Sequence, residues 1–137
     1  MLRDSRRKIY DLEALEELIS ALQEASACGC AIIVEGPRDR DSLRRLGISG
    51  PIILSSRHST LQLAEESARR YRDIVILTDW DGKGEELARI MEVYLRPTGC
   101  RLDLDTRRRL RILTQKEIKD VESLWHYVER ARESQGV

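Results

Sequence analysis

Two hydrophobic patterns alternate along the chain. Short runs of consecutive apolar residues are typical of strands buried on both faces of a sheet, whereas apolar residues that recur every three or four positions are typical of amphipathic helices. The runs predict strands at residues 31–34, 51–54, 74–78 and 110–113. The recurring pattern predicts helices at residues 9–27, 38–46, 60–71, 83–95 and 116–132. Residues 1–8 are polar and arginine-rich, and we expect a frayed arm there.

The order of these elements predicts the fold class. Strands that alternate with helices at this spacing indicate an α/β protein with a parallel sheet covered by helices on both faces. In such sheets, ligands bind beyond the carboxyl ends of the strands, where the winding direction reverses. We expect the 137 residues to form one domain.

Composition narrows the classes of partner. The chain is 41% hydrophobic and 35% charged, and its 24 basic and 24 acidic residues leave a formal net charge of zero. Binding to nucleic acid would therefore depend on local basic patches. No apolar run approaches the roughly 20 residues that span a membrane, and no signal-peptide segment is visible, so we expect a cytoplasmic protein without a membrane partner. The three cysteines lack a C-x-x-C pair, which favours reduced thiols over a zinc site.

Acidic residues follow two of the predicted strands. The strand at 74–78 ends in Asp79-Trp80-Asp81, and the strand at 31–34 ends in Glu35. In an extended backbone Asp79 and Asp81 point the same way, and two carboxylates held so close repel unless a hard cation lies between them. The alternative is an Asp-Gly turn with a capping aspartate. If the two strands are neighbours, the three carboxylates converge, which favours a metal site.

These motifs resemble those of the Toprim domain, a metal-binding catalytic module shared by topoisomerases, bacterial-type primases, OLD-family nucleases and ribosomal RNA maturases. The resemblance rests on IIVEG, which contains Glu35 and Gly36, and on the D-x-D-x-x-G-E pattern from Asp79 to Glu85. It covers residues 30–113 and implies a three-layer, Rossmann-like fold with a central four-stranded parallel sheet. The size and layout are similar to those of small, stand-alone Toprim proteins found mainly in archaea.

The resemblance also implies roles for the acids. In the family the D-x-D aspartates bind Mg²⁺, for which Mn²⁺ can substitute, and the glutamate acts as a general acid or base or as a further ligand. Here those residues are Asp79 and Asp81 for the metal and Glu35 for the proton or the metal. Physical chemistry supports this division, because phosphodiester chemistry needs positive charge near the phosphoryl oxygens.

Other residues near the predicted strand ends are candidates for supporting roles. Phosphate or substrate contacts are expected from the glycines and basic residues Gly36, Arg38, Lys83 and Gly84. Supplementary acids are Glu85, which also suits the first turn of a helix, and Asp120, which follows the predicted fourth strand. His58 and the basic run Arg107–Arg109 could belong either to the site or to a solvated surface. A second D-x-D, Asp103 and Asp105, has the same two alternatives, and we interpret it as surface.

Three functions compete. The first is Mg²⁺-dependent phosphodiester chemistry on RNA or DNA, as a nuclease or a processing factor. The second is a non-catalytic module that binds nucleic acid or joins an RNA-processing complex, which the zero net charge favours. The third is a small-molecule phosphohydrolase, although haloacid dehalogenases carry their D-x-D after the first strand. A homodimer through the first or last helix is a further expectation, since both helices carry wide apolar stripes.

Overall fold

The computed structural model describes the backbone of residues 2–135 and the side chains of residues 11–134. The helices are α1 (Leu2–Ala27), α2 (Pro37–Arg45), α3 (Thr60–Arg70), α4 (Gly82–Leu95), α5 (Asp105–Thr114) and α6 (Leu124–Gln135). The strands are β1 (Ala31–Val34), β2 (Ile52–Leu54), β3 (Asp73–Ile76) and β4 (Arg101–Asp103). Short 3-10 turns, η1 (Ser55–Arg57) and η2 (Arg96–Thr98), follow β2 and α4.

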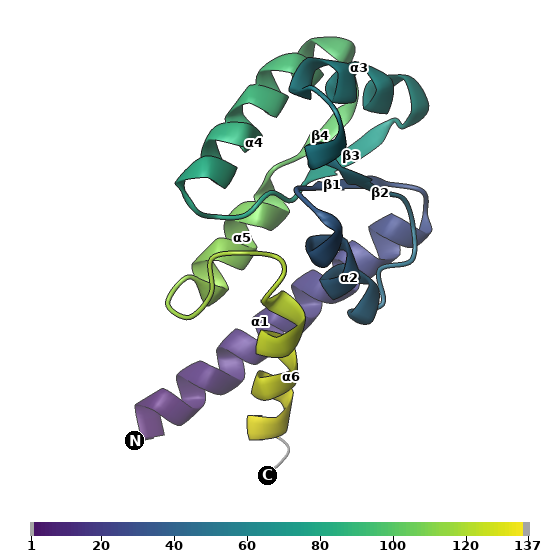
Figure 1. Cartoon of the computed structure of the whole chain (residues 1–137). Coiled ribbons are helices and arrows are strands. Elements are labelled where there is room, and N and C mark those ends of the chain that lie inside the picture. The colour runs from purple at the N-terminus through teal and green to yellow at the C-terminus, as the bar shows by residue number, and fades with distance from the viewer. Residues whose placement is uncertain (1, 136–137) are drawn as a thin grey trace.

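The strands form one four-stranded parallel sheet in the order β2-β1-β3-β4. Alternate residues of β1 enter two hydrophobic cores: Ile32 and Val34 pack with α1, α2, α5 and α6, whereas Ile33 packs with α3 and α4. The helices therefore cover both faces of the sheet, with α3 and α4 on one side and the others opposite (Figure 1). The predicted α/β class and three-layer parallel architecture are confirmed.

The chain reverses its winding direction between β1 and β3. From β1 it crosses through α2 to the edge strand β2, and it then runs the opposite way through α3 to β3 and through α4 to β4. Neighbouring strands wound in opposite directions leave a crevice at their carboxyl ends, which is where α/β sheets bind ligands. In this protein the crevice lies between the ends of β1 and β3.

The fourth strand was predicted at the wrong residues. Residues 110–113 belong to α5, and the fourth strand is β4 at Arg101–Asp103. In α5 the buried positions are Arg107, Leu110 and Thr114, which follow helical spacing. β4 lies at an edge of the sheet and has no fully buried residue, so it carries no apolar run.

Both terminal helices also differ from the prediction. The first begins at Leu2 rather than near residue 9, so residues 2–8 are helical. The last begins at Leu124 rather than near residue 116, because residues 115–123 form turns. Ile118 and Val121 are buried, but the carbonyls of Ile118 and Lys119 accept hydrogen bonds from Trp80 instead of from a continuing helix.

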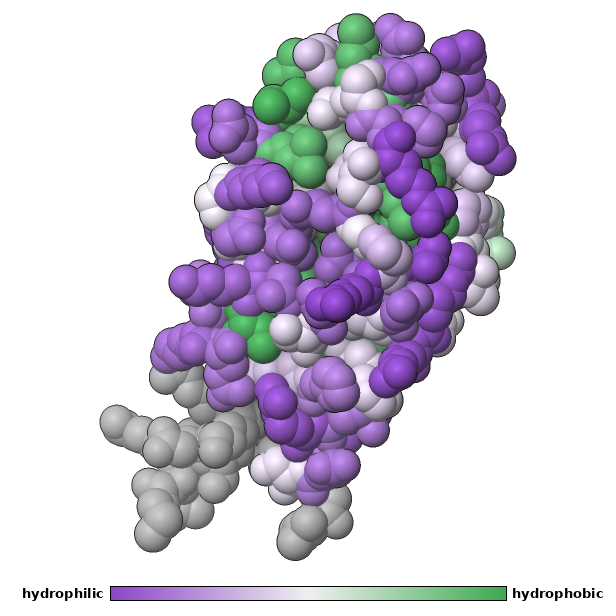
Figure 2. Space-filling view, in the orientation of Figure 1, coloured by the Kyte–Doolittle hydropathy of each residue, from purple (hydrophilic) through white to green (hydrophobic). Residues whose placement is uncertain are grey.

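The face shown in Figure 2 is largely hydrophilic, with hydrophobic residues gathered over its upper part. The large exposed apolar side chains are Leu61 on α3, Ile90, Val93 and Tyr94 on α4, and Ile112 on α5. Within the described part of the chain, no helix combines the length and the apolar character needed to cross a bilayer.

Candidate functional site

Glu35 and Asp79 lie side by side at the crevice between β1 and β3. Glu35 directly follows β1, and Asp79 lies just beyond β3 on the neighbouring strand. The backbone N–H of Asp79 donates a hydrogen bond to Oε2 of Glu35 at 2.8 Å. Both residues are half-buried. The structure therefore brings together two of the three acids that the sequence predicted to converge.

Asp39 is a third acid beside this pair, and the sequence analysis missed it. Its side chain is only 7% exposed, and its Oδ2 accepts a hydrogen bond from the backbone N–H of Gly36 at 3.0 Å at the start of α2. Burial and the charge of Glu35 raise the pKa of Asp39. An acid three positions after a helix N-cap is a recognisable capping signal, but it gives no sign of proximity to another strand.

The negative charges at this point are poorly compensated. The pKa of Asp79 is raised to about 7, first by burial, then by the negative charges of Asp39 and Glu35 and by a hydrogen bond between the Asp79 and Glu35 carboxyl groups. The N–H of Val121, which donates to Oδ1 of Asp79 at 3.0 Å, opposes this shift. Like charges held together in a partly buried site favour either a proton or a cation.

Asp81 does not join the pair. It is exposed, and its Oδ1 accepts a hydrogen bond from the N–H of Gly84 at 2.7 Å as the N-cap of α4. This is the capping arrangement that the sequence left open as an alternative. Among residues 11–134, whose side chains the structure describes, no three His, Cys, Asp or Glu residues are grouped so that they could hold a metal ion.

The donor chemistry of Glu35 and Asp79 nevertheless fits Mg²⁺. This ion prefers oxygen ligands and is usually held by one or two carboxylates, with water and substrate phosphate completing its coordination. A close pair of carboxylates that already accept backbone N–H groups on one side supplies such donors. A divalent ion would also offset the charge that raises the pKa of Asp79.

The segment at residues 115–123 forms hydrogen bonds with the loop that carries Asp79. The N–H of Trp80 donates to the carbonyl of Lys119, and its indole Nε1 donates to the carbonyl of Ile118, both at 2.9 Å. Trp80 is only 7% exposed, so its ring serves as an anchor in the core. Together with the bond from Val121 to Asp79, these contacts fix the loop against the start of α6.

The predicted basic run at Arg107–Arg109 does not form an open basic surface. Arg107 is only 4% exposed and pairs with Glu85 at 2.9 Å. Arg108 and Arg109 both pair with Asp105, at 2.6 and 2.7 Å. Glu85, predicted as a supplementary acid, therefore lies against Arg107 behind the loop.

The remaining candidates take varied positions. Arg38 is 82% exposed and lies 3.5 Å from Glu122, and Lys83 is exposed at the first turn of α4. His58 is exposed in the loop after β2. Oδ1 of Asp120 accepts a hydrogen bond from the N–H of Ser123 at 2.8 Å, and this turn follows α5 rather than a fourth strand.

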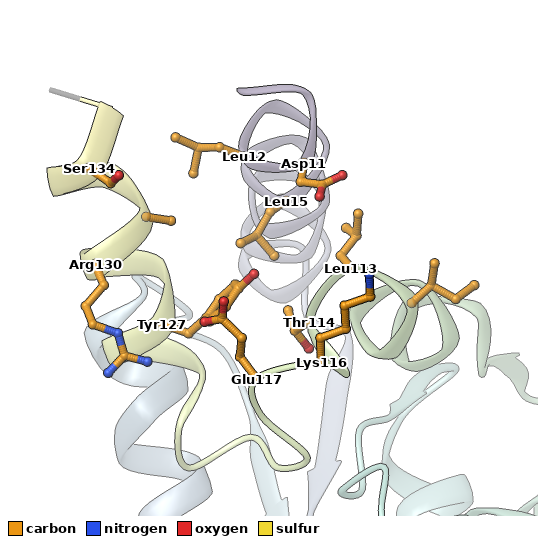
Figure 3. A pocket seen from close by; sticks show the side chains of 12 residues that line it. Asp11, Leu12, Leu15, Leu113, Thr114, Lys116, Glu117, Tyr127, Arg130 and Ser134 are labelled. Carbon is orange, nitrogen blue, oxygen red and sulfur yellow. The ribbon is translucent and has the colours of Figure 1, made fainter. Parts of the chain in front are cut away.

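One cavity of the described structure lies away from the acid pair. It has a volume of about 420 Å³ and is enclosed by α1, the end of α5 with the following turn, and α6 (Figure 3). Its lining mixes apolar residues such as Leu12 with the charged residues Glu117 and Lys116. Neither Glu35 nor Asp79 lines it.

Comparison with known proteins gives a concordant result. A family model described as the Toprim domain matches residues 30–113. A UPF0292 protein from Methanosarcina acetivorans is 47% identical over 126 residues, which cover 92% of this chain and 88% of the relative. A UPF0292 protein from Pyrococcus abyssi is 47% identical over 113 residues, covering 81% of each chain. A solved structure of a protein from Aquifex aeolicus matches with a TM-score of 0.67 at 26% identity, covering 80% of this chain and 96% of that one.

Proposed function

The chain belongs to the Toprim family, and on that premise we propose that it performs Mg²⁺-dependent phosphodiester chemistry on nucleic acid, as a nuclease or as an RNA- or DNA-processing factor. The observation that carries the proposal is the contact between Glu35 and Asp79 at the switch point of the sheet. Family membership alone indicates the coarser conclusion of a metal-dependent function related to nucleic acids.

In this proposal Glu35 and Asp79 hold the metal ion. When bound, the ion supplies positive charge for the phosphoryl oxygens on which negative charge develops. The N–H of Asp79 holds the Glu35 carboxylate in place, where it would bind the ion or exchange a proton with the reacting oxygen. Asp81 keeps the start of α4 in place through its cap.

Substrate contact is assigned to the basic residues at the rim of the crevice. Arg38 is 82% exposed at the start of α2, and Lys83 is exposed at the start of α4, so the two lie on the helices that follow Glu35 and Asp79. A chain with no net charge needs such local groups to hold a phosphate backbone. The contact is therefore expected to involve few phosphates, and the affinity for nucleic acid should depend only modestly on salt concentration.

The test is cleavage of labelled single- and double-stranded RNA and DNA by the purified full chain, in Mg²⁺, in Mn²⁺ and in EDTA. We expect cleavage that requires the metal and that falls about a hundredfold or more in Glu35→Gln, which keeps an acceptor for the N–H of Asp79. The control is Asp41→Asn, since the Asp41 side chain is 65% exposed and lies on the same helix as Asp39. Metal-dependent cleavage that survives Glu35→Gln unchanged would contradict the assigned site.

A second function has its own supporting observation. Asp81 is engaged as a helix cap, and no three-acid metal group exists among the described side chains, which is compatible with a module that binds RNA without cutting it. Such a module would act inside an RNA-processing complex. Equal RNA affinity in Mg²⁺ and in EDTA, with no cleavage in either, would favour this function over the catalytic one.

A further inference from the structure

Arg107 is buried directly behind the loop that carries Asp79. Only 4% of the residue is exposed, although it belongs to a run of three consecutive arginines. Buried arginine is rare unless its charge and donors are satisfied. Here the side chain reaches from α5 to the end of β3, and its neighbours Arg108 and Arg109 pair with Asp105 at the surface.

Three nitrogens of the Arg107 guanidinium have defined partners. Nε donates to the backbone carbonyl of Thr78 at 2.9 Å, and Nη2 donates to the carbonyl of Asp79 at 2.6 Å. Nη1 donates to Oε2 of Glu85 at 2.9 Å. The planar fork of arginine suits this arrangement, because it addresses two consecutive carbonyls and one carboxylate without changing its own conformation.

These contacts complete the restraint on Asp79. Its N–H is bonded to Glu35, its carboxylate accepts from the N–H of Val121, and its carbonyl accepts from Arg107. The residue lies beyond the last paired residue of β3, so no strand neighbour fixes its backbone. Arg107 supplies the restraint that the sheet no longer provides.

We propose that Arg107 is a positioning residue for the candidate metal site, because it fixes the Thr78–Asp79 backbone and thereby holds the Asp79 carboxylate beside Glu35. The role is carried by Arg107 with Glu85 as its charged anchor, and the catalytic consequence rests on the function proposed above. Neither side chain needs to touch metal or substrate. The arrangement consists of one guanidinium bonded to two carbonyls and one carboxylate, which lysine cannot reproduce.

A purely structural ion pair would behave differently. It would lower the melting temperature when removed, and the fraction of molecules that stay folded would keep the same affinity for metal. A positioning residue changes the geometry of the ligand within folded molecules. Substitution should therefore weaken Mn²⁺ binding and loosen the N–H of Asp79 under conditions in which the protein is folded.

The experiment compares Arg107→Lys with Arg108→Lys, a matched change on an exposed neighbour of the same helix. The readouts are the Kd for Mn²⁺, measured by electron paramagnetic resonance, and the hydrogen-exchange rate of the Asp79 amide, measured by NMR, both well below the melting temperature. We expect Arg107→Lys to raise the Kd for Mn²⁺ about tenfold or more and to speed exchange of the Asp79 amide. In a cleavage assay, kcat should fall and more metal should be needed, with KM for nucleic acid unchanged. Arg108→Lys should match the unsubstituted protein.

Glu85→Gln is the second variant and decides the matter if Arg107→Lys does not fold. It preserves both carbonyl contacts but removes the charged anchor, so we expect smaller changes in the same direction. Unchanged Asp79 exchange and Mn²⁺ affinity in a folded variant, with only a lower melting temperature, would overturn the proposal. If the unsubstituted protein cleaves nothing, the proposed function fails, whereas the exchange rate of the Asp79 amide still decides whether Arg107 positions it.

Discussion

The protein contains two D-x-D sequences near the carboxyl ends of neighbouring parallel strands, but the two lie in different surroundings. After β3, Asp79 is half-buried and in contact with Glu35 of the adjacent strand end. At the end of β4, Asp103 is the last residue of the strand and accepts hydrogen bonds from the N–H groups of Asp105 and Thr106 at 2.8 and 3.1 Å. Asp105 pairs with arginines on the surface. Both patterns start a helix, α4 through Asp81 and α5 through Asp103, but the first also places an aspartate in the candidate metal site.

The position of each aspartate relative to the end of its strand explains why their surroundings differ. Asp103 is paired with Val75 inside the sheet, whereas Asp79 lies beyond the end of β3. β4 is also an edge strand, and β3 is its neighbour in the sheet of residues 2–135. Asp79 instead faces the end of the central strand β1, which carries Glu35. The neighbouring strand, more than the motif itself, decides what a D-x-D can do.

The first prediction tests this difference with one substitution at each motif. Asp79→Asn removes a charge from the acid pair, and we expect metal-dependent cleavage to fall about a hundredfold or more. Asp103→Asn keeps the acceptor that holds Asp105 and Thr106, so cleavage should change less than about twofold. The measurement is the initial cleavage rate in Mn²⁺, with melting curves to show that both variants fold. Equal losses in the two variants would mean that the motifs are not distinguished by their surroundings.

The second prediction concerns the tightness of the loop after β3. A Cβ built on Gly84 would lie only 1.9 Å from the carbonyl oxygen of Asp79, whereas a Cβ on Gly82 would meet nothing within 4 Å. We expect Gly84→Ala to destabilise the fold by about 1–3 kcal/mol and to displace Asp79. Gly82→Ala should be neutral or slightly stabilising. Urea unfolding of both variants gives the answer, and a Gly84→Ala protein as stable as Gly82→Ala would show that the loop is loose.

The third prediction separates the two roles that Asp81 can have. Asparagine caps a helix about as well as aspartate, so Asp81→Asn should leave the free energy of unfolding unchanged, and Asp81→Ala should lower it by about 1 kcal/mol. Thermal unfolding of the two variants in EDTA measures the cap without interference from metal. A weaker Mn²⁺ affinity in Asp81→Asn, at unchanged stability, would instead identify Asp81 as the third ligand expected from the sequence.

The buried half of the fold could be predicted because burial leaves a trace in the sequence. β1 and β3 are runs of apolar residues, and the acids at their ends are plain to read. β4 has no run of apolar residues, because Arg101 is exposed and Asp103 accepts a hydrogen bond at the start of α5. The apolar residues at 110–113 looked like a strand, but Leu110 faces the core from one side of a helix.

The site could be predicted only as far as local patterns reach. Glu35 and Asp79 are marked by their positions after strands, but the burial of Arg107 depends on two carbonyls far away in the chain. The turns at 115–123 carry apolar residues at helical spacing, and tertiary hydrogen bonds from Trp80 overrule that local preference. Contacts of this kind are set by the folded arrangement and leave no periodic signal.

The last prediction concerns the effect of Asp103, in the second D-x-D, on the pKa of the Cys30 thiol. Burial, followed by the negative charges of Asp73 and Asp103, raises the pKa of Cys30 to about 11 from an ordinary value of 9.0. The folded state therefore favours the protonated thiol, and this contribution to stability is complete below pH 9 and is lost as the pH rises towards 11.

Asp103→Asn should lower the pKa of Cys30 slightly, because it removes the smaller of the two charges that raise it. Asp105→Asn is the matched control, since Asp105 pairs with Arg108 and Arg109 at the surface and has no part in the shift. The pH dependence of Cys30 alkylation, followed by mass spectrometry so that exposed Cys28 is counted separately, measures the shift. If both variants gave the same profile as the unsubstituted protein, burial and the charge of Asp73 would account for the raised pKa of Cys30, and the role of Asp103 would be limited to starting α5.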